Sequence, residues 1–261
     1  MRARLVNKWQ FSSRLALHSF LTPIERVRWA QANVSIVCVL AVTPIFLSLI
    51  ALLTDWDLAL ADAAFDFGLN AFPLRHAWLT EVFNHVILKG LFIVIALGFL
   101  ITVLWDLISP RSWSWLRRFQ FRVVALSAIL VPTVISSLKQ ISHRHCPWDL
   151  RHYGGTEPYV RLFEYLPVGT ESGRCMPAGH ASSALWMISF SIFFIPHRLM
   201  RAATVLAALL AVGFSVGWLQ QLRGAHFLTH TLWSLWLALA TVFFVTTCLD
   251  RWPVRQSINR S

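Results

Sequence analysis

Charged residues are scarce in this sequence. Asp, Glu, Lys and Arg together make up 13% of its 261 residues, whereas soluble domains carry roughly a quarter. Acidic residues are the scarcest, 12 against 23 Lys and Arg, while Trp and Phe reach 13 and 19. Hydrophobic residues make up 56% of the chain, and several apolar runs approach the roughly 20 residues that a bilayer crossing requires. The composition excludes an ordinary soluble domain and predicts a membrane protein with one compact domain.

The apolar runs predict an all-α, polytopic membrane protein with six transmembrane helices. These runs lie at about 32–54, 83–105, 123–138, 180–195, 202–222 and 227–249. The third run is short for a bilayer crossing, so we expect its helix to begin a few residues earlier. Residues 32–249 then form the membrane domain, between a basic arm at 1–31 and a tail at 250–261.

The positive charge predicts how the protein is oriented. The formal net charge of +11 comes from short clusters between apolar runs, not from a basic stripe on a polar domain, so we expect no nucleic-acid partner. The Arg-rich segments fall on one side of a six-span layout, which the positive-inside rule makes cytoplasmic. We therefore expect both termini on the cytoplasmic side of a cell inner membrane. The segments expected on the outer, periplasmic side are the acidic stretch 55–81, the loop 139–177 and the turn at Arg223.

Only four cysteines are present, and they divide into two pairs. Cys38 and Cys248 lie within apolar runs, where we interpret them as small packing residues. Cys146 and Cys175 both lie in the loop 139–177. An oxidising outer compartment would allow them to form a disulfide that closes this loop. Two free thiols are the alternative.

Three polar segments flank the predicted spans on the outer side. The first contains Lys139 and Arg144, the second Gly179 and His180, and the third Arg223, His226 and His230. In a helix the last three residues would share one face, because they are spaced by three and four. Each segment alone has an ordinary explanation, as a snorkelling lysine, a helix start or interhelical hydrogen bonds. Together they would place cations and imidazoles at one membrane level.

This set of side chains fits phosphate chemistry. Lys139, Arg144 and Arg223 are suited to neutralising phosphate oxygens. A helix that begins near Gly179 would add backbone N–H groups and the positive end of its dipole. Of two histidines, one can attack phosphorus and the other can protonate the leaving oxygen.

The three segments resemble the PAP2 (type-2 phosphatidic acid phosphatase) superfamily. Its pattern is Lys-x6-Arg-Pro, then Pro-Ser-Gly-His, then Ser-Arg-x5-His-x3-Asp. The residues of this chain that fit are Lys139, Pro147, Pro177, Gly179, His180 and His226. The resemblance implies a six-helix membrane core that removes phosphate from lipid phosphates through a phosphohistidine, without metal or other cofactor. It makes His226 the nucleophile and His180 the general acid.

The chain departs from this pattern at several positions. Cys146 stands at the first arginine and Ala178 at the serine, Leu219-Gln220 replaces the Ser-Arg pair, and His230 replaces the aspartate. We expect Arg144 and Arg223 to substitute for the arginines. We expect His230 to orient His226, with Asp149 or Asp62 as alternatives. A bacterial subgroup with Cys-Pro-Trp-Asp, Pro-Ala-Gly-His and Arg-Gly-Ala-His segments is similar, so these departures indicate a divergent branch.

Other functions remain open at this point. Candidate substrates are phosphatidic acid, phosphatidylglycerophosphate, a polyprenyl diphosphate or a lipid A phosphate. A lipid phosphotransferase would use the same intermediate with a lipid acceptor in place of water. A non-catalytic lipid binder or transporter would explain the missing arginine and aspartate. A zinc site would draw three ligands from His143, His145, His152, His180, His226 and His230.

Overall fold

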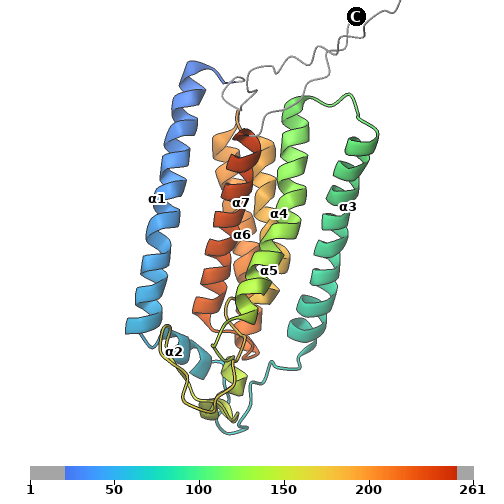
Figure 1. The fold of residues 1–261 in the computed structure, drawn as a ribbon. Coiled ribbons are helices and arrows are strands. Elements are labelled where there is room, and N and C mark those ends of the chain that lie inside the picture. Colours follow the sequence, from blue (N-terminus) through green and yellow to red (C-terminus); the bar gives the residue numbers. More distant parts are fainter. Residues whose placement is uncertain (1–20, 252–261) are drawn as a thin grey trace, which may run out of the picture.

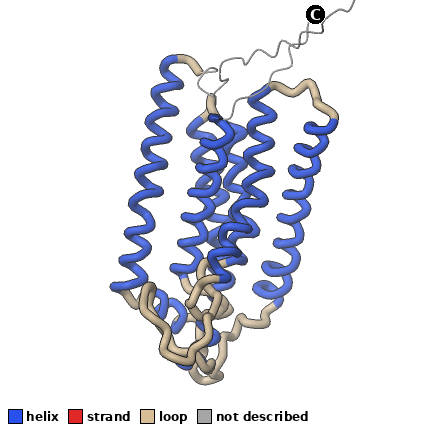
Figure 2. The backbone as a smooth tube through the Cα atoms, viewed as in Figure 1, coloured by secondary structure: helices blue, strands red, loops and turns tan. Residues whose placement is uncertain are grey.

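The computed structural model describes residues 21–251. Residues 1–20 and 252–261, which hold most of the predicted basic arm and tail, lie outside the described residues. Long apolar helices stand side by side in a bundle (Figure 1), and no strand is present within 21–251 (Figure 2). The long helices are α1 (Pro23–Leu53), α3 (Lys89–Ile108), α4 (Trp115–Gln140), α6 (Leu199–Leu222) and α7 (Leu228–Arg251). The shorter ones are α2 (Trp56–Asp62) and α5 (Gly179–Leu185).

Five helices are long and apolar enough to cross a membrane. They cover five of the six predicted spans, and the helix from 115 to 140 begins earlier than the apolar run at 123, as expected. A π-helical segment, Leu79–Leu88, extends α3 at its start. The outward faces of α1 and α3 expose large apolar side chains such as Val34, Ile45, Val94 and Ile101. Such a continuous apolar surface is typical of contact with lipid.

The remaining predicted span, 180–195, does not form a long α-helix. It consists of α5, seven residues long, followed by nine residues of 3-10 helix, Trp186–Phe194. Because a 3-10 helix rises about 2.0 Å per residue against about 1.5 Å in an α-helix, this rod is roughly 28 Å long. Its side chains are buried inside the bundle, where it packs against α4, α6 and α7. A short element therefore runs through the centre of the bundle.

Two glycines of α6 allow close packing around this rod. A Cβ at Gly213 would lie 2.2 Å from Cδ2 of Leu185, and a Cβ at Gly217 would lie 2.3 Å from Cγ2 of Thr231. Small residues spaced by four let helix backbones approach closely in membrane proteins. The glycines thus bring α6 against both α5 and α7, the two helices next to the candidate histidines.

The three segments predicted to lie on the outer side meet at one end of the bundle, the lower end in Figure 1. They share a small apolar cluster built from Phe65 and Phe72 of the first segment, Leu150 and Tyr153 of the second, and Phe227 of the third. Two short 3-10 turns, Pro147–Asp149 and Arg151–Tyr153, shape the middle segment. This cluster joins the three segments at the ends of α4, α5 and α7.

Candidate active site

The turn between α6 and α7 directs His226 into the protein. Gly224 adopts φ +77°, which favours glycine, and a Cβ there would lie 2.4 Å from the ring of Phe72. The backbone N–H of Ala225 donates to the carbonyl of Gln220, so the chain folds back tightly after α6. The imidazole of His226 is only 1% exposed as a result. The Arg-Gly-Ala-His sequence is therefore a tight turn that buries the predicted nucleophile.

His180 lies directly against His226. Nδ1 of His180 is 3.2 Å from Nε2 of His226, although 46 residues separate them in sequence. His180 is the second residue of α5, and the Lys139 side chain at the end of α4 reaches the same place. The Lys139 ammonium lies 3.8 Å from where a Cβ on Gly179 would stand. Burial, followed by the neighbouring His180, His230 and Lys139, lowers the pKa of His226 well below its usual value.

Arg223 contacts the side chain of Gln220, which stands at a family arginine position. Its guanidinium Nη1 is 3.4 Å from Oε1 of Gln220, and Nη2 is 3.9 Å from a carboxylate oxygen of Glu81. The Nε atom is buried without a hydrogen-bond partner among the described residues. Burial lowers the pKa of Arg223, while Glu81 opposes that shift. The displaced arginine thus reaches the side chain at the family position.

Arg144 is held by the outer loop. Its guanidinium donates to the carbonyls of Val160, at 2.6 Å, and Glu164, at 3.1 Å. Burial lowers the pKa of Arg144, and Glu164 opposes that shift. Arg144 also lines a small cavity together with His230. Two of its donors are therefore used for loop structure, and it faces His230 rather than the His180–His226 contact.

His230 contacts His226 edge to face, and its predicted role in orienting His226 stays a prediction. The two ring centroids are 5.9 Å apart, and Nδ1 of His230 is buried without a hydrogen-bond partner within residues 21–251. The two alternative acids are also engaged elsewhere. Asp62 accepts from His152 and Tyr153, and Asp149 accepts from the backbone N–H of Cys146. Spacing of four thus brought the two rings edge to face, but it gave Nδ1 of His230 no hydrogen bond to His226, which precedes α7 and lies in the turn.

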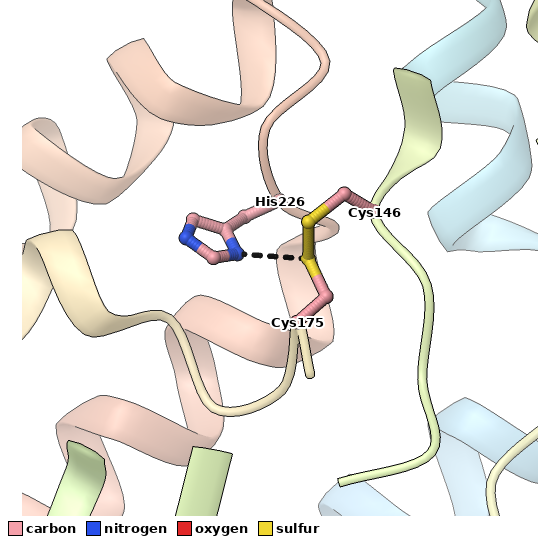
Figure 3. Close-up of side chains that lie close together, drawn as sticks. All are labelled: Cys146, Cys175 and His226. Atoms are coloured by element: carbon pink, nitrogen blue, oxygen red, sulfur yellow. Dashed lines mark hydrogen bonds between the residues drawn. A yellow bond between two sulfur atoms is a disulfide. The ribbon is translucent and has the colours of Figure 1, made fainter. Parts of the chain in front are cut away.

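A disulfide lies beside the histidines. Cys146 and Cys175 are joined, as predicted, and Cys175 is completely buried. Its sulfur lies 3.4 Å from Nδ1 of His226 (Figure 3). Within the described residues, Cys146, Cys175 and His226 form the only group with metal-ligand spacing, their ligand atoms all within 4.8 Å. Because sulfurs in a disulfide are not thiolates, this group does not fit a resident metal ion in the oxidised protein.

Sequence reasoning missed two features of the site. The first is Asp57, a buried carboxylate that accepts from the backbone N–H of Thr229 at the start of α7. Burial raises the pKa of Asp57, although the hydrogen bonds from Thr229 counteract this. The second is Trp148, whose ring lies 4.9 Å from the guanidinium carbon of Arg75 and 5.6 Å from that of Arg223. Only the acidic stretch around Asp57 gave any sequence signal, since both contacts depend on the folded loops.

The long apolar helices indicate a multi-pass membrane protein, with paired imidazoles and a buried arginine near one end of the bundle. The sequence model of the PAP2 superfamily matches residues 120–253, more than half of the chain, and the chain belongs to this superfamily. The matched range begins within α4, continues through α7 and includes both histidines. Membership makes this a phosphatase-type protein. No curated protein and no solved structure matches the chain.

Proposed function

We propose that this chain removes a phosphate group from a lipid phosphomonoester or diphosphate through a phosphohistidine at His226. The observation that carries the proposal is the 3.2 Å contact between Nε2 of His226 and Nδ1 of His180, beside the Lys139 ammonium. A nucleophile must reach phosphorus, and a general acid must lie within hydrogen-bond reach of the oxygen that it protonates. The two nitrogens are close enough for one phosphate group to meet both when it enters between them. No other pair of imidazoles among the described residues is hydrogen-bonded in this way.

The proposed reaction has two steps. Because the two rings touch, His180 first turns aside to admit the phosphate group. Nε2 of His226 then attacks phosphorus, the bond to the lipid oxygen breaks, and His180 donates a proton to that oxygen. In the second step His180 takes a proton from water, the hydroxide attacks the phosphohistidine, and inorganic phosphate leaves with His226 restored. With a lipid diphosphate as substrate, the leaving group would be the lipid monophosphate instead of the lipid alcohol.

The surrounding cations provide the charge that the reaction requires. Lys139 lies against Gly179, next to His180, and Arg223 lies three residues before His226. We propose that both bind the non-bridging oxygens, where a charge-assisted hydrogen bond contributes about 1.5–3 kcal/mol. We propose that Arg144 acts from the far side, through the donors that its two carbonyl bonds leave available.

An apolar cavity beside the site supports a lipid substrate. It has a volume of about 700 Å³ and lies between the end of α4, the start of α7 and the outer loop. Its lining includes the apolar side chains of Leu138, Trp233, Trp236 and Leu237 of the long helices, together with Arg144 and Pro177. A cavity of this size fits part of an acyl or prenyl chain. We propose that the chain of the lipid lies here while its phosphate reaches His226.

We also propose that the central rod of α5 and the 3-10 segment crosses the membrane as a sixth span. Its length of roughly 28 Å is close to the hydrocarbon thickness of about 30 Å. Six crossings place the Arg-rich ends together in the cytoplasm and the histidines at the outer face of a cell inner membrane. Residues 32–249 would be the catalytic membrane domain.

Phosphate release from purified protein in detergent or liposomes tests the proposed function. The panel contains the four candidate lipid phosphates and a water-soluble aryl phosphate, each assayed with and without EDTA. We expect release from at least one lipid in both conditions, none above background with His226→Ala, and a loss of roughly 100-fold or more with His180→Asn. Labelled phosphate on the protein should be acid-labile and absent from His226→Ala.

Two results would overturn this proposal. The first is full turnover by His226→Ala, which would exclude His226 as the nucleophile. The second is activity that EDTA abolishes and zinc restores, which would favour the metal-site alternative. His152→Ala is a matched control, because His152 pairs with Asp62 on the outer loop, and its activity should stay within about 2-fold of the unmodified protein.

A further inference from the structure

The Cys146–Cys175 disulfide lies where a nucleophilic histidine needs a partner. Figure 3 shows the sulfur of Cys175 in line with Nδ1 of His226, at 3.4 Å. Both groups are buried, Cys175 at 0% and His226 at 1% exposure. On the opposite side of the ring, Nε2 faces His180 at 3.2 Å. The imidazole is thus held between a disulfide sulfur and a second imidazole.

The chemistry of a disulfide determines which nitrogen carries the proton. A disulfide sulfur has no hydrogen, so a hydrogen bond in this contact requires Nδ1 of His226 as its donor. The backbone of Cys175 adds a hydrogen bond that favours the protonated ring. With its proton on Nδ1, neutral His226 has its lone pair on Nε2, directed toward His180. This is the tautomer that a nucleophile requires.

No carboxylate competes for this position among the described residues. Asp62 and Asp149 bond elsewhere, as does Asp57 with Thr229. Histidines that act chemically usually have a partner at the second nitrogen that fixes ring orientation. Here that partner belongs to residue 175, which also leads into Gly179 and His180.

We propose that the Cys146–Cys175 disulfide is the positioning group for His226, in place of a carboxylate, and that turnover therefore depends on this bond being oxidised. The inference rests on the proposed function for its kinetic readout. It also predicts the His226 tautomer, which is independent of any activity. Cys175 is the positioning residue, and Cys146 acts by holding the sulfur of Cys175 in its aprotic form.

The backbone around the disulfide makes this role separable from loop closure. The N–H groups of Arg174 and Cys175 donate to the carbonyls of Ser142 and Arg144, at 3.0 and 2.9 Å. A Cβ at Gly173 would lie 2.4 Å from the carbonyl oxygen of Arg144, so the backbone segments around these two residues are in close contact. None of these contacts involves the sulfur atoms, so we expect the loop to keep its path when the disulfide is reduced.

Two single variants distinguish positioning from loop closure. Cys146→Ala and Cys175→Ala both break the disulfide, but only Cys146→Ala keeps a sulfur next to Nδ1 of His226. A purely structural disulfide predicts equal losses. We expect kcat to fall roughly 10- to 100-fold in Cys175→Ala. The loss in Cys146→Ala should be at least about 5-fold smaller, because the Cys175 thiol can still accept a hydrogen bond from Nδ1 of His226. KM should stay within about 2-fold in both variants. Thermal unfolding in the same detergent reports whether each variant is folded.

Reduction of the unmodified protein provides the second arm. A phosphine reductant with EDTA should lower kcat, and reoxidation should restore it. EDTA is required because reduced Cys146 and Cys175 would lie with His226 at metal-ligand spacing. The variant Cys38→Ala/Cys248→Ala is the matched control, since both thiols are free, and it should respond to reductant as the unmodified protein does.

Imidazole ¹⁵N chemical shifts, assigned with His226→Asn, provide a readout that does not need turnover. We expect the Nδ1–H tautomer in the oxidised protein and a mixture of tautomers in Cys175→Ala. Equal kcat losses in the two single variants, unchanged kcat after reduction, or an Nε2–H tautomer in the oxidised protein would each overturn the proposal. Absence of all phosphatase activity together with the Nδ1–H tautomer would count against the proposed function and support the positioning contact.

Discussion

Asp57 accepts hydrogen bonds from both the backbone N–H and the hydroxyl of Thr229, across 172 residues of sequence. Thr229 is the second residue of α7, so a carboxylate from α2 caps the helix that follows the candidate nucleophile. The first N–H groups of a helix have no partner within the helix. The acidic outer stretch thereby fixes where α7 begins and, with it, the turn that holds His226.

Removing this cap should loosen the start of α7. We expect Asp57→Ala to lower the free energy of unfolding by about 0.5–2 kcal/mol and to reduce kcat, because His226 loses its rigid support. Thermal unfolding and phosphate release in one detergent measure both effects. Asp55→Ala is the comparison, since Asp55 is exposed and pairs with Arg161 at the surface, where such pairs contribute about 0–1 kcal/mol. Equal losses in the two variants would contradict the capping role.

Two arginines flank Trp148, and only one should be needed for phosphate. We expect Arg223→Gln to lower kcat/KM roughly 10- to 100-fold, because it removes a buried charged donor. Arg75→Gln removes the exposed guanidinium from the other contact with Trp148 and should change kcat/KM by less than about 3-fold. Steady-state kinetics with the preferred lipid measures kcat/KM for both variants. A larger loss in Arg75→Gln would move the phosphate site outward from His226.

The lowered pKa of His226 gives the protein a specific pH dependence. Because the pKa of His226 is lowered, its imidazole stays neutral and keeps its lone pair at pH values below the ordinary pKa of about 6.5. The rate of attack by His226 should therefore fall only when the pH is well below about 6.5. The unfolded chain, in contrast, takes up a proton near pH 6.5. The contribution of His226 to stability is therefore fully present above pH 6.5 and is lost as the pH falls toward the folded-state pKa.

Thermal unfolding between pH 7.5 and roughly pH 5 measures this linkage. His226→Asn, which does not titrate, should show a flatter pH dependence than the unmodified protein. Identical slopes would mean that the buried imidazole is protonated in the folded state as readily as in the unfolded chain.

Close packing of α6 should be sensitive to one methyl group. We expect Gly217→Ala to destabilise the protein by roughly 1–3 kcal/mol, because the new Cβ would meet the β-branched, buried side chain of Thr231 at 2.3 Å. Gly98→Ala in α3 is the matched control. A Cβ at Gly98 has no atom within 4 Å, and alanine there should be neutral or stabilising by up to about 1 kcal/mol. Denaturation of both variants in the same detergent tests the difference.

Much of the bundle was predictable because its signals are local. Apolar runs of sufficient length predicted five of the helices that the structure contains, and the short third run was correctly expected to extend backwards. The charge pattern of the loops predicted which segments meet at one end. The segment 180–195 is helical, and its crossing of the membrane stays a prediction. Its division into α5 and a 3-10 rod was not predicted, because burial among three helices decides that geometry.

The sequence by itself determined the composition of the site: two histidines, a lysine, an arginine and a pair of cysteines, each at the end of an apolar run. Only the tertiary structure decided which of them touch. It left Nδ1 of His230 without a hydrogen-bond partner among the described residues, engaged Arg144 with two carbonyls, and placed Asp57 on α7 and Cys175 on Nδ1 of His226. These contacts join segments up to 172 residues apart. The spacing of residues along the chain specifies which side chains share one face of a helix. The path of the loops specifies which other side chains contact that face.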